Sequence, residues 1–169
     1  MKIKTISLWQ PHASLIALGE KPFETRSWWP NYRGLLAIHA SKRVPVSADI
    51  NHEFGDALRD VMHKHRIRPQ TEWPLGCVVG VCELVHIYGT RGDGRSTASS
   101  GKVHLGKEWP DNATYAHLFG DFSLGRYAWL LAKVRRFKEP IPTKGRQGLW
   151  TLWDAPEEWE SLLIRERRK

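Results

Sequence analysis

The stretch Ser7–Trp28, SLWQPHASLIALGEKPFETRSW, decides the fold of this chain, because a strand, a helix and a second strand follow one another within it. Pro11 suits the first position of a helix, where its missing N–H would have no partner. Gly19 can adopt the left-handed backbone conformation that ends a helix. The residues from Phe23 onward are expected to be extended. We therefore expect a helix over 11–18 between two strands.

Four unlike side chains meet where this helix passes into the second strand. Side chains on a strand alternate between its faces, so Glu24, Arg26 and Trp28 share one face while Thr25 points to the other. Lys21 lies in the turn just before them. Such a set is unsuited to a core and suited to a binding site. The alternative is a surface ion pair of Glu24 with Arg26, worth about 0–1 kcal/mol.

The pattern Gly-x-Lys-x-x-Glu-x-Arg, here Gly19, Lys21, Glu24 and Arg26, resembles the hallmark of the activating signal cointegrator homology (ASCH) domain. The resemblance covers most of the chain. Its further blocks are SLWQPHASLI (7–16), RGLLAIHASK (33–42), WPLGCVVGVCEL (73–84), GRYAW (125–129) and KGRQGLW (144–150). ASCH domains resemble pseudouridine synthase and archaeosine transglycosylase (PUA) domains. The resemblance therefore implies an α+β fold, a PUA-like mixed β-barrel with capping helices, and a cleft beside the corner.

The whole chain, 1–169, is expected to form a single domain. Residues 89–108 are polar and lack periodicity, which predicts a flexible inserted loop. A terminal helix is expected over 156–169. The other expected elements are strands over 3–9, 34–40, 77–88, 127–136 and 149–153 and helices over 46–65 and 109–118.

The chain is basic, with a formal net charge of +8 and a pI near 9.7. The positive charge is concentrated in two blocks, 1–43 and 126–146, which the fold could bring together. A basic surface of this kind attracts polyanions. The alternative is a solvated surface that only keeps the protein soluble. The chain also has nine tryptophans, and any exposed indole could stack on an unpaired base.

Charge and aromatic content together predict a nucleic-acid-binding domain, for RNA or DNA. Basic side chains would contact phosphates, and aromatic side chains would stack on a base. Glu24 would accept hydrogen bonds from a base amino group, as a carboxylate does with cytosine N4. The residues predicted to bind nucleic acid are Trp9, Lys21, Glu24, Arg26, Trp28, His39, Lys42, Arg43, Arg126, Tyr127, Arg135 and Arg136.

A hydrolase is an alternative that the resemblance raises. Some small ASCH proteins hydrolyse the modified nucleoside N4-acetylcytidine with a lysine, a threonine and a glutamate. Lys21 matches that lysine, Glu24 stands in the place of the threonine, and Glu83 is a candidate for the glutamate. Other ASCH proteins are ribonucleases, and for that chemistry His39 and Lys21 could act as base and electrophile. A packed strand histidine is the structural alternative for His39.

A protein-interaction adaptor is the third class, in which the cleft would bind an acidic peptide. No Cys/His pattern predicts a metal site, and no cofactor is expected. Cys77 and Cys82 are five residues apart on one strand, so they are expected on opposite faces and unable to bridge. No apolar run is long enough for a membrane span, and residues 2–11, KIKTISLWQP, lack the apolar stretch of a secretion signal. We expect a cytoplasmic monomer without membrane contact.

Overall fold

The computed structural model describes residues 1–46, 52–67, 73–90 and 118–164. Three expected segments lie largely outside these ranges: the helix over 109–118 apart from residue 118, the inserted loop apart from its first two residues, and the beginning of the helix over 46–65. Within the described residues, the six strands and the two α-helices follow one another along the chain in the expected order. No helix in these ranges is both long enough and apolar enough to cross a bilayer.

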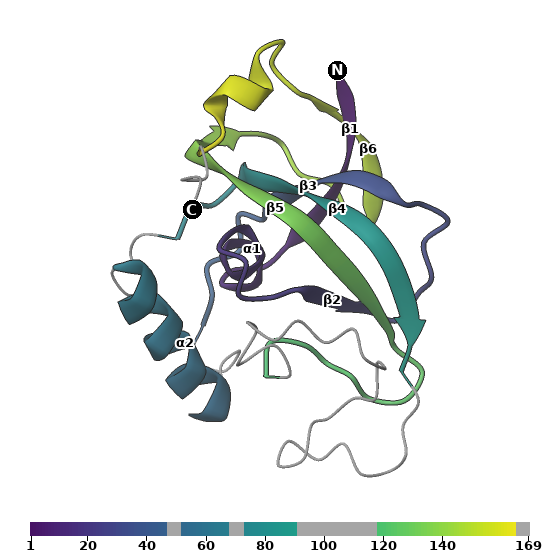
Figure 1. Cartoon of the computed structure of the whole chain (residues 1–169), viewed down its shortest axis with the longest axis vertical. Helices are drawn as coiled ribbons and strands as arrows, with labels where there is room; N and C mark the ends of the chain where they lie inside the picture. Colours follow the sequence, from purple (N-terminus) through teal and green to yellow (C-terminus); the bar gives the residue numbers. More distant parts are fainter. Residues whose placement is uncertain (47–51, 68–72, 91–117, 165–169) are drawn as a thin grey trace.

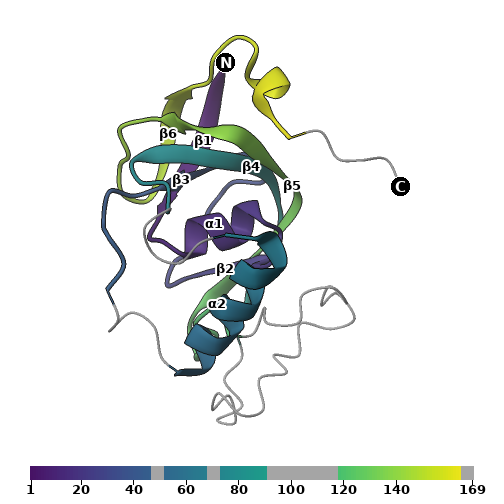
Figure 2. The same cartoon turned by 90° about the vertical axis from the view of Figure 1, so that its left-hand side faces the viewer.

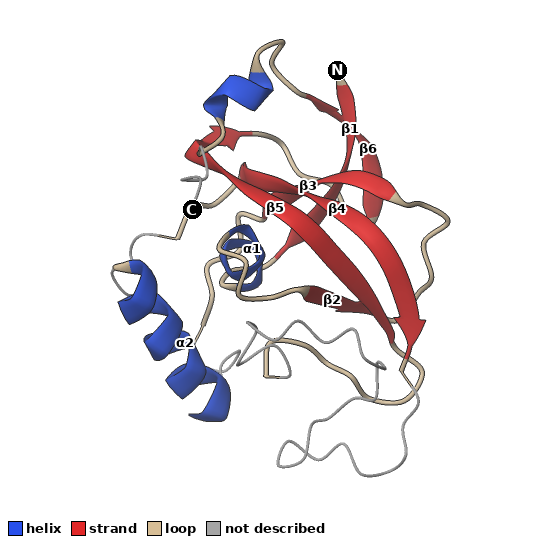
Figure 3. Ribbon diagram, in the orientation of Figure 1, coloured by secondary structure: helices blue, strands red, loops and turns tan. Residues whose placement is uncertain are grey.

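Six strands form one curled sheet in the order β2-β5-β4-β3-β1-β6. All neighbouring strands run antiparallel except β1 and β3, which are parallel. Figures 1 and 3 show the sheet curling into a half-barrel. This architecture confirms the α+β, PUA-like barrel fold. The strands are β1 (Lys2–Leu8), β2 (Phe23–Arg26), β3 (Gly34–Ala40), β4 (Cys77–Gly89), β5 (Tyr127–Pro142) and β6 (Leu149–Asp154).

Helix α1 (His12–Ala17) fills the concave side of the sheet, as Figures 1 and 2 show from two directions. Ala13 to Ala17 are all buried, and Ala13, Ile16 and Ala17 pack in a core formed by the apolar faces of β1, β3, β4 and β5. Gln10 closes the first turn, because its Oε1 accepts a hydrogen bond from the Ser14 N–H at 3.1 Å. Gly19 ends the helix at φ 79°, as its position in the sequence predicts.

Helix α2 (His52–His65) packs beside α1 through one apolar face. Its buried side chains are Phe54, Ala57, Leu58, Val61 and Met62, and they meet Leu15 of α1 and Phe119. Phe119 lies far away in the sequence, so this contact brings the segment 118–121 next to α1 and α2.

A bulge in β4 changes the orientation expected for the two cysteines. Cys77 and Cys82 lie in the same core cluster, not on opposite faces. His39 pairs with Val78 and Ile38 with Gly80, so Val79 is an extra residue in β4. One extra residue reverses the alternation of faces beyond it. Both cysteines are buried and free.

The helix expected over 156–169 is only a 3-10 helix, η3 (Trp159–Leu162), in the described part of that segment. Leu163 is already extended and forms an isolated bridge with Phe137 of β5. Ile164 N–H donates to the carbonyl oxygen of Arg136 at 2.8 Å. Trp159 and Leu163 are buried against this part of the sheet. Pairing and burial here favour an extended chain over a continued helix.

Candidate functional site

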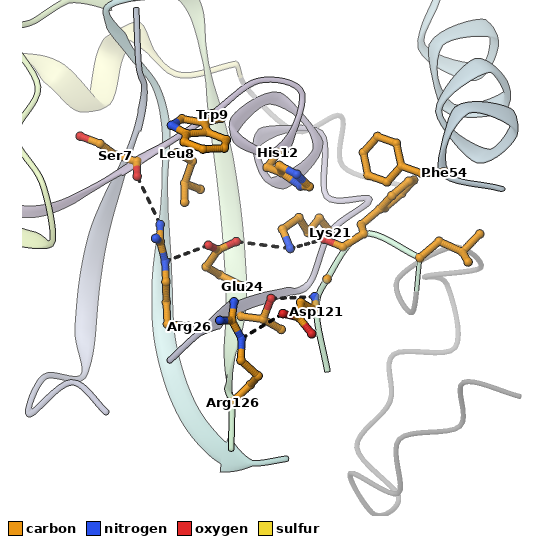
Figure 4. A pocket seen from close by; sticks show the side chains of 14 residues that line it. Ser7, Leu8, Trp9, His12, Lys21, Glu24, Arg26, Phe54, Asp121 and Arg126 are labelled. Carbon is orange, nitrogen blue, oxygen red and sulfur yellow. Dashed lines mark hydrogen bonds and ion pairs between the residues drawn. The ribbon is translucent and has the colours of Figure 1, made fainter. Parts of the chain in front are cut away.

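A pocket of about 390 Å³ opens beside the corner that joins α1 to β2 (Figure 4). Five parts of the chain line it: the end of β1, the beginning of α1, the corner with β2, helix α2, and the segment 118–126. The lining residues are Ser7, Leu8, Trp9, His12, Lys21, Glu24, Thr25, Arg26, Phe54, Leu118, Phe119, Gly120, Asp121 and Arg126.

Lys21, Glu24 and Arg26 form a continuous chain of charges in this pocket (Figure 4). Glu24 Oε2 lies 3.3 Å from Lys21 Nζ, and Glu24 Oε1 lies 3.0 Å from Arg26 Nε. Arg26 also donates to the backbone carbonyl of Ser7 at 3.3 Å, which ties β2 to β1. Lys21 is 2 % exposed and Glu24 7 % exposed. Buried charges of this kind are tolerated because each has an opposite charge beside it.

The ammonium group of Lys21 is unusually deep for a lysine. Burial lowers its pKa, and the neighbouring Glu24 carboxylate only partly opposes that shift. Lys21 Nζ also donates a hydrogen bond to the carbonyl oxygen of Phe119. Lys21 therefore holds the segment 118–121 against β2, and it gives up its proton more readily than an exposed lysine does.

The segment 118–121 forms one wall of the pocket, and the sequence pattern gives no sign of this. Besides the bond from Lys21, Asp121 N–H donates to Thr25 Oγ1 at 2.9 Å. Asp121 Oδ2 lies 3.3 Å from Arg126 Nε. Gly120 packs so closely that an added Cβ would lie 2.7 Å from the Phe122 ring. Phe119, Gly120 and Asp121 thus join a site whose charged corner, Lys21 to Arg26, lies nearly a hundred positions earlier.

Trp9 stands at the rim of the pocket and is 55 % exposed. The Arg43 guanidinium lies over its ring, 3.8 Å from the centroid. Trp28 differs, because it packs inward against Trp129 with ring centroids 4.8 Å apart. Tyr127 is the cross-strand partner of Arg26 in the pairing of β2 with β5. Of these three predicted aromatic residues, Trp9 is the one that lines the pocket, and its indole is exposed to a ligand there.

His39 belongs to a different part of the fold from Lys21. It does not line the pocket, and its ring packs against Trp150 and Gly145. Its Nε2 lies 3.0 Å from the carbonyl oxygen of Thr143, and its Nδ1 lies 3.1 Å from Ser7 Oγ. A carbonyl only accepts, so Nε2 carries the proton and Nδ1 accepts from the Ser7 hydroxyl. Burial lowers the pKa of His39, which favours this neutral form.

The remaining predicted residues are spread over other surfaces. Glu83 pairs with Lys133 at 2.7 Å, and both side chains are exposed. Arg135 lies over the Trp159 ring, and Arg136 lines a second cavity of about 270 Å³. Lys42 is exposed, and its stem lies against Gly76. The fold thus brings Lys21, Arg26 and Arg126 into the pocket, and it does not bring Arg135 or Arg136 there. Among the described residues, no group of three or more metal-binding side chains is positioned to hold a metal ion.

A curled α+β half-barrel with a lysine, a glutamate and an arginine at its helix-to-strand corner defines the class of this protein as a PUA-like domain. The model of the ASCH domain matches residues 6–141, most of the chain. The chain belongs to the ASCH domain family, and this membership supports nucleic-acid binding at the level of the family.

Three relatives show how far the similarity extends. Activating signal cointegrator 1 of Homo sapiens and of Mus musculus are each 34 % identical over 80 residues, which is 47 % of this chain and 13 % of the relative. A catalase-peroxidase of Rhodococcus erythropolis is 30 % identical over 149 residues, 78 % of this chain and 18 % of the relative. The chain therefore spans less than a fifth of each relative's length.

Proposed function

We propose that this domain binds single-stranded nucleic acid, preferably RNA, and takes one nucleotide into the pocket. The observation that carries the proposal is the pocket itself, where a fixed chain of charges lies beside an exposed indole. Its volume of about 390 Å³ lies within the range of small-ligand pockets. We include in the proposal that the domain acts as a cytoplasmic monomer.

The charge balance of the lining fits a nucleotide of a nucleic-acid strand. Three basic side chains, Lys21, Arg26 and Arg126, face two carboxylates, Glu24 and Asp121. The lining thus has a surplus of a single positive charge, which complements one phosphodiester. A ligand base would stack on Trp9, which supplies a flat apolar face at the entrance.

Glu24 is suited to read the polar edge of that base. Each of its oxygens is near one cation, and a carboxylate oxygen can accept more than one hydrogen bond. An amino group such as cytosine N4 is the matching donor. Because Lys21 and Arg26 keep the carboxylate in one orientation, Glu24 binds such a group without losing further freedom.

Calorimetric titration with cytidine 5′-monophosphate (CMP) tests the proposal. We expect saturable binding that weakens as salt rises, because salt screens the attraction between the phosphate and the basic lining. Trp9→Ala should weaken binding between about 5-fold and 150-fold, the equivalent of one lost stacked base. Arg136→Ala is the matched control, since this exposed arginine lies at the other cavity. Equal binding by the wild type and Trp9→Ala would show that the pocket does not take the base.

A hydrolase is the second candidate, and one observation favours it. The buried Lys21 has a lowered pKa, and a lysine that loses its proton readily can serve as a base or a nucleophile. Thr25 lines the same pocket and supplies a hydroxyl group one residue from Glu24. Incubation with N4-acetylcytidine, followed by measurement of cytidine release, tests this candidate. Release that is lost in Lys21→Met would rank it above simple binding.

A further inference from the structure

A second exposed indole lies close to the pocket, on the loop between β2 and β3. Trp29 is 48 % exposed and is absent from the set predicted from the sequence. Its neighbour Trp28 is packed inward against Trp129, so the two adjacent tryptophans have opposite surroundings. Figure 1 shows this loop running from the end of β2 past the beginning of β5.

Trp29 is supported on two sides. The Tyr127 ring meets it edge to face, with centroids 5.6 Å apart and planes at 87°. The Arg33 guanidinium lies 5.3 Å from its ring centroid. Arg33 is itself held in place, because its Nη1 donates to the carbonyl oxygens of Pro30 at 3.2 Å and Tyr32 at 2.7 Å. The indole is therefore a braced surface with a fixed cation beside it.

A short path connects this indole to the pocket. Arg26 lines the pocket, and Tyr127 is its direct partner across the β2–β5 pair. Side chains opposite one another in an antiparallel pair lie next to each other on one face. Tyr127 in turn contacts Trp29. Two neighbouring aromatic rings, Tyr127 and Trp29, thus lie between two cations, Arg26 on the pocket side and Arg33 on the far side.

We propose that Trp29 is a second stacking platform, for a nucleotide adjacent to the one held in the pocket. Arg33 lies over the indole and Arg26 lies beyond Tyr127 on the pocket side, so the two supply positive charge for the phosphates on either side of that nucleotide. This inference rests on the proposed function, and it makes the ligand a single strand of at least two nucleotides rather than a free nucleoside. Every base has a face that can stack, so the platform contributes affinity without choosing a sequence.

The test compares two ligands on the same variants. CMP reports the pocket alone, and the single-stranded pentaribonucleotide of cytidine reports the pocket and the platform together. We expect Trp29→Ala to weaken pentanucleotide binding by at least about fivefold and to change CMP binding by less than about twofold. Trp29→Phe keeps an aromatic ring and should restore most of the loss. Trp9→Ala should weaken both ligands.

Two further results separate the possible failures. Trp29 is half-exposed, so its variants should keep the wild-type melting temperature, and Arg33→Glu offers an independent change on the same surface. An unchanged pentanucleotide affinity in Trp29→Ala and in Arg33→Glu overturns the platform. Absence of CMP binding in the wild type overturns the proposed function of the pocket. If pentanucleotide binding still depends on Trp29 in that case, the nucleic acid contacts the loop between β2 and β3 and not the pocket.

Discussion

Lys21 and Glu24, three residues apart in the sequence, form an ion pair of 3.3 Å between Nζ and Oε2, with both side chains buried. The turn after Gly19 and the first residues of β2 aim the two side chains into the same pocket. The pair therefore has two roles. It satisfies a carboxylate that also binds Arg26, and it fixes the ammonium group that holds the Phe119 carbonyl.

Glu24→Gln should destabilise the protein, because it leaves the Lys21 charge without a counter-ion in a buried place. Removing one partner of a buried pair costs about 3–5 kcal/mol, and we expect about 3 kcal/mol because Arg26 is partly exposed. Urea unfolding measures the change. Glu83→Gln is the matched control, since the pair of Glu83 with Lys133 is exposed and its loss should change the free energy of unfolding by at most about 1 kcal/mol. Equal effects of the two substitutions would contradict the buried pair.

Lys21→Met should change how stability depends on pH. The pKa of Lys21 is lowered in the folded protein, below the value of 10.5 for a free lysine side chain. Between the folded and the unfolded pKa, the unfolded chain binds more protons, so the contribution of Lys21 to stability rises with pH. Below the folded pKa, Lys21 is protonated in both states, and the cost of burying its charge does not change with pH. The difference in unfolding free energy between wild type and Lys21→Met, measured from neutral to alkaline pH, should therefore shift in favour of the wild type as pH rises. A constant difference would show that the lysine is solvated.

His39→Gln should weaken the fold and spare ligand binding, because His39 is buried outside the pocket. Its hydrogen bonds to Thr143 and Ser7 would be lost or distorted, at a cost of about 1–3 kcal/mol. The wild type should also lose stability as pH falls through 6.5, because the unfolded chain takes up a proton that the folded His39, with its lowered pKa, resists. Thermal unfolding at several pH values and CMP titration measure both effects. A strong loss of CMP affinity without loss of stability would make His39 part of the binding site.

Gly145→Ala should destabilise the protein through the same histidine. A Cβ at this position would lie 2.2 Å from Cε1 of the His39 ring, so the ring or the loop must move. Overpacking of this kind costs about 1–3 kcal/mol. Gly89→Ala is the control, since a Cβ there meets no atom within 4 Å. Similar melting temperatures for the two variants would contradict the packing of Gly145 on His39.

The local part of the site could be predicted because it depends on neighbouring residues. The helix predicted over 11–18 is α1, His12–Ala17, and the strand predicted over 34–40 is β3, Gly34–Ala40. A turn followed by a strand brings Lys21, Glu24 and Arg26 together through bond geometry alone. The expectation that Thr25 faces away from Glu24 follows the same rule, yet both residues line the pocket. Among the described strands β2 lies at the edge of the sheet, with β5 as its neighbour, so side chains from both of its faces can reach a pocket at the open edge.

The charged corner could be read from the sequence alone, because it follows from the spacing of residues within one turn and one strand, and the fold class followed from the resemblance of the sequence blocks to the ASCH family. Only the tertiary structure decided what closes the pocket and what lies outside it. The wall at Phe119 and Asp121 is held by Lys21 and Thr25 across nearly a hundred residues, and no local pattern encodes such a contact. His39, Arg135 and Arg136 have residue types as suitable as those of Lys21 and Arg26. What separates the residues outside the pocket from those inside it is their position in the folded sheet. That position depends on bulges and on long-range strand pairing.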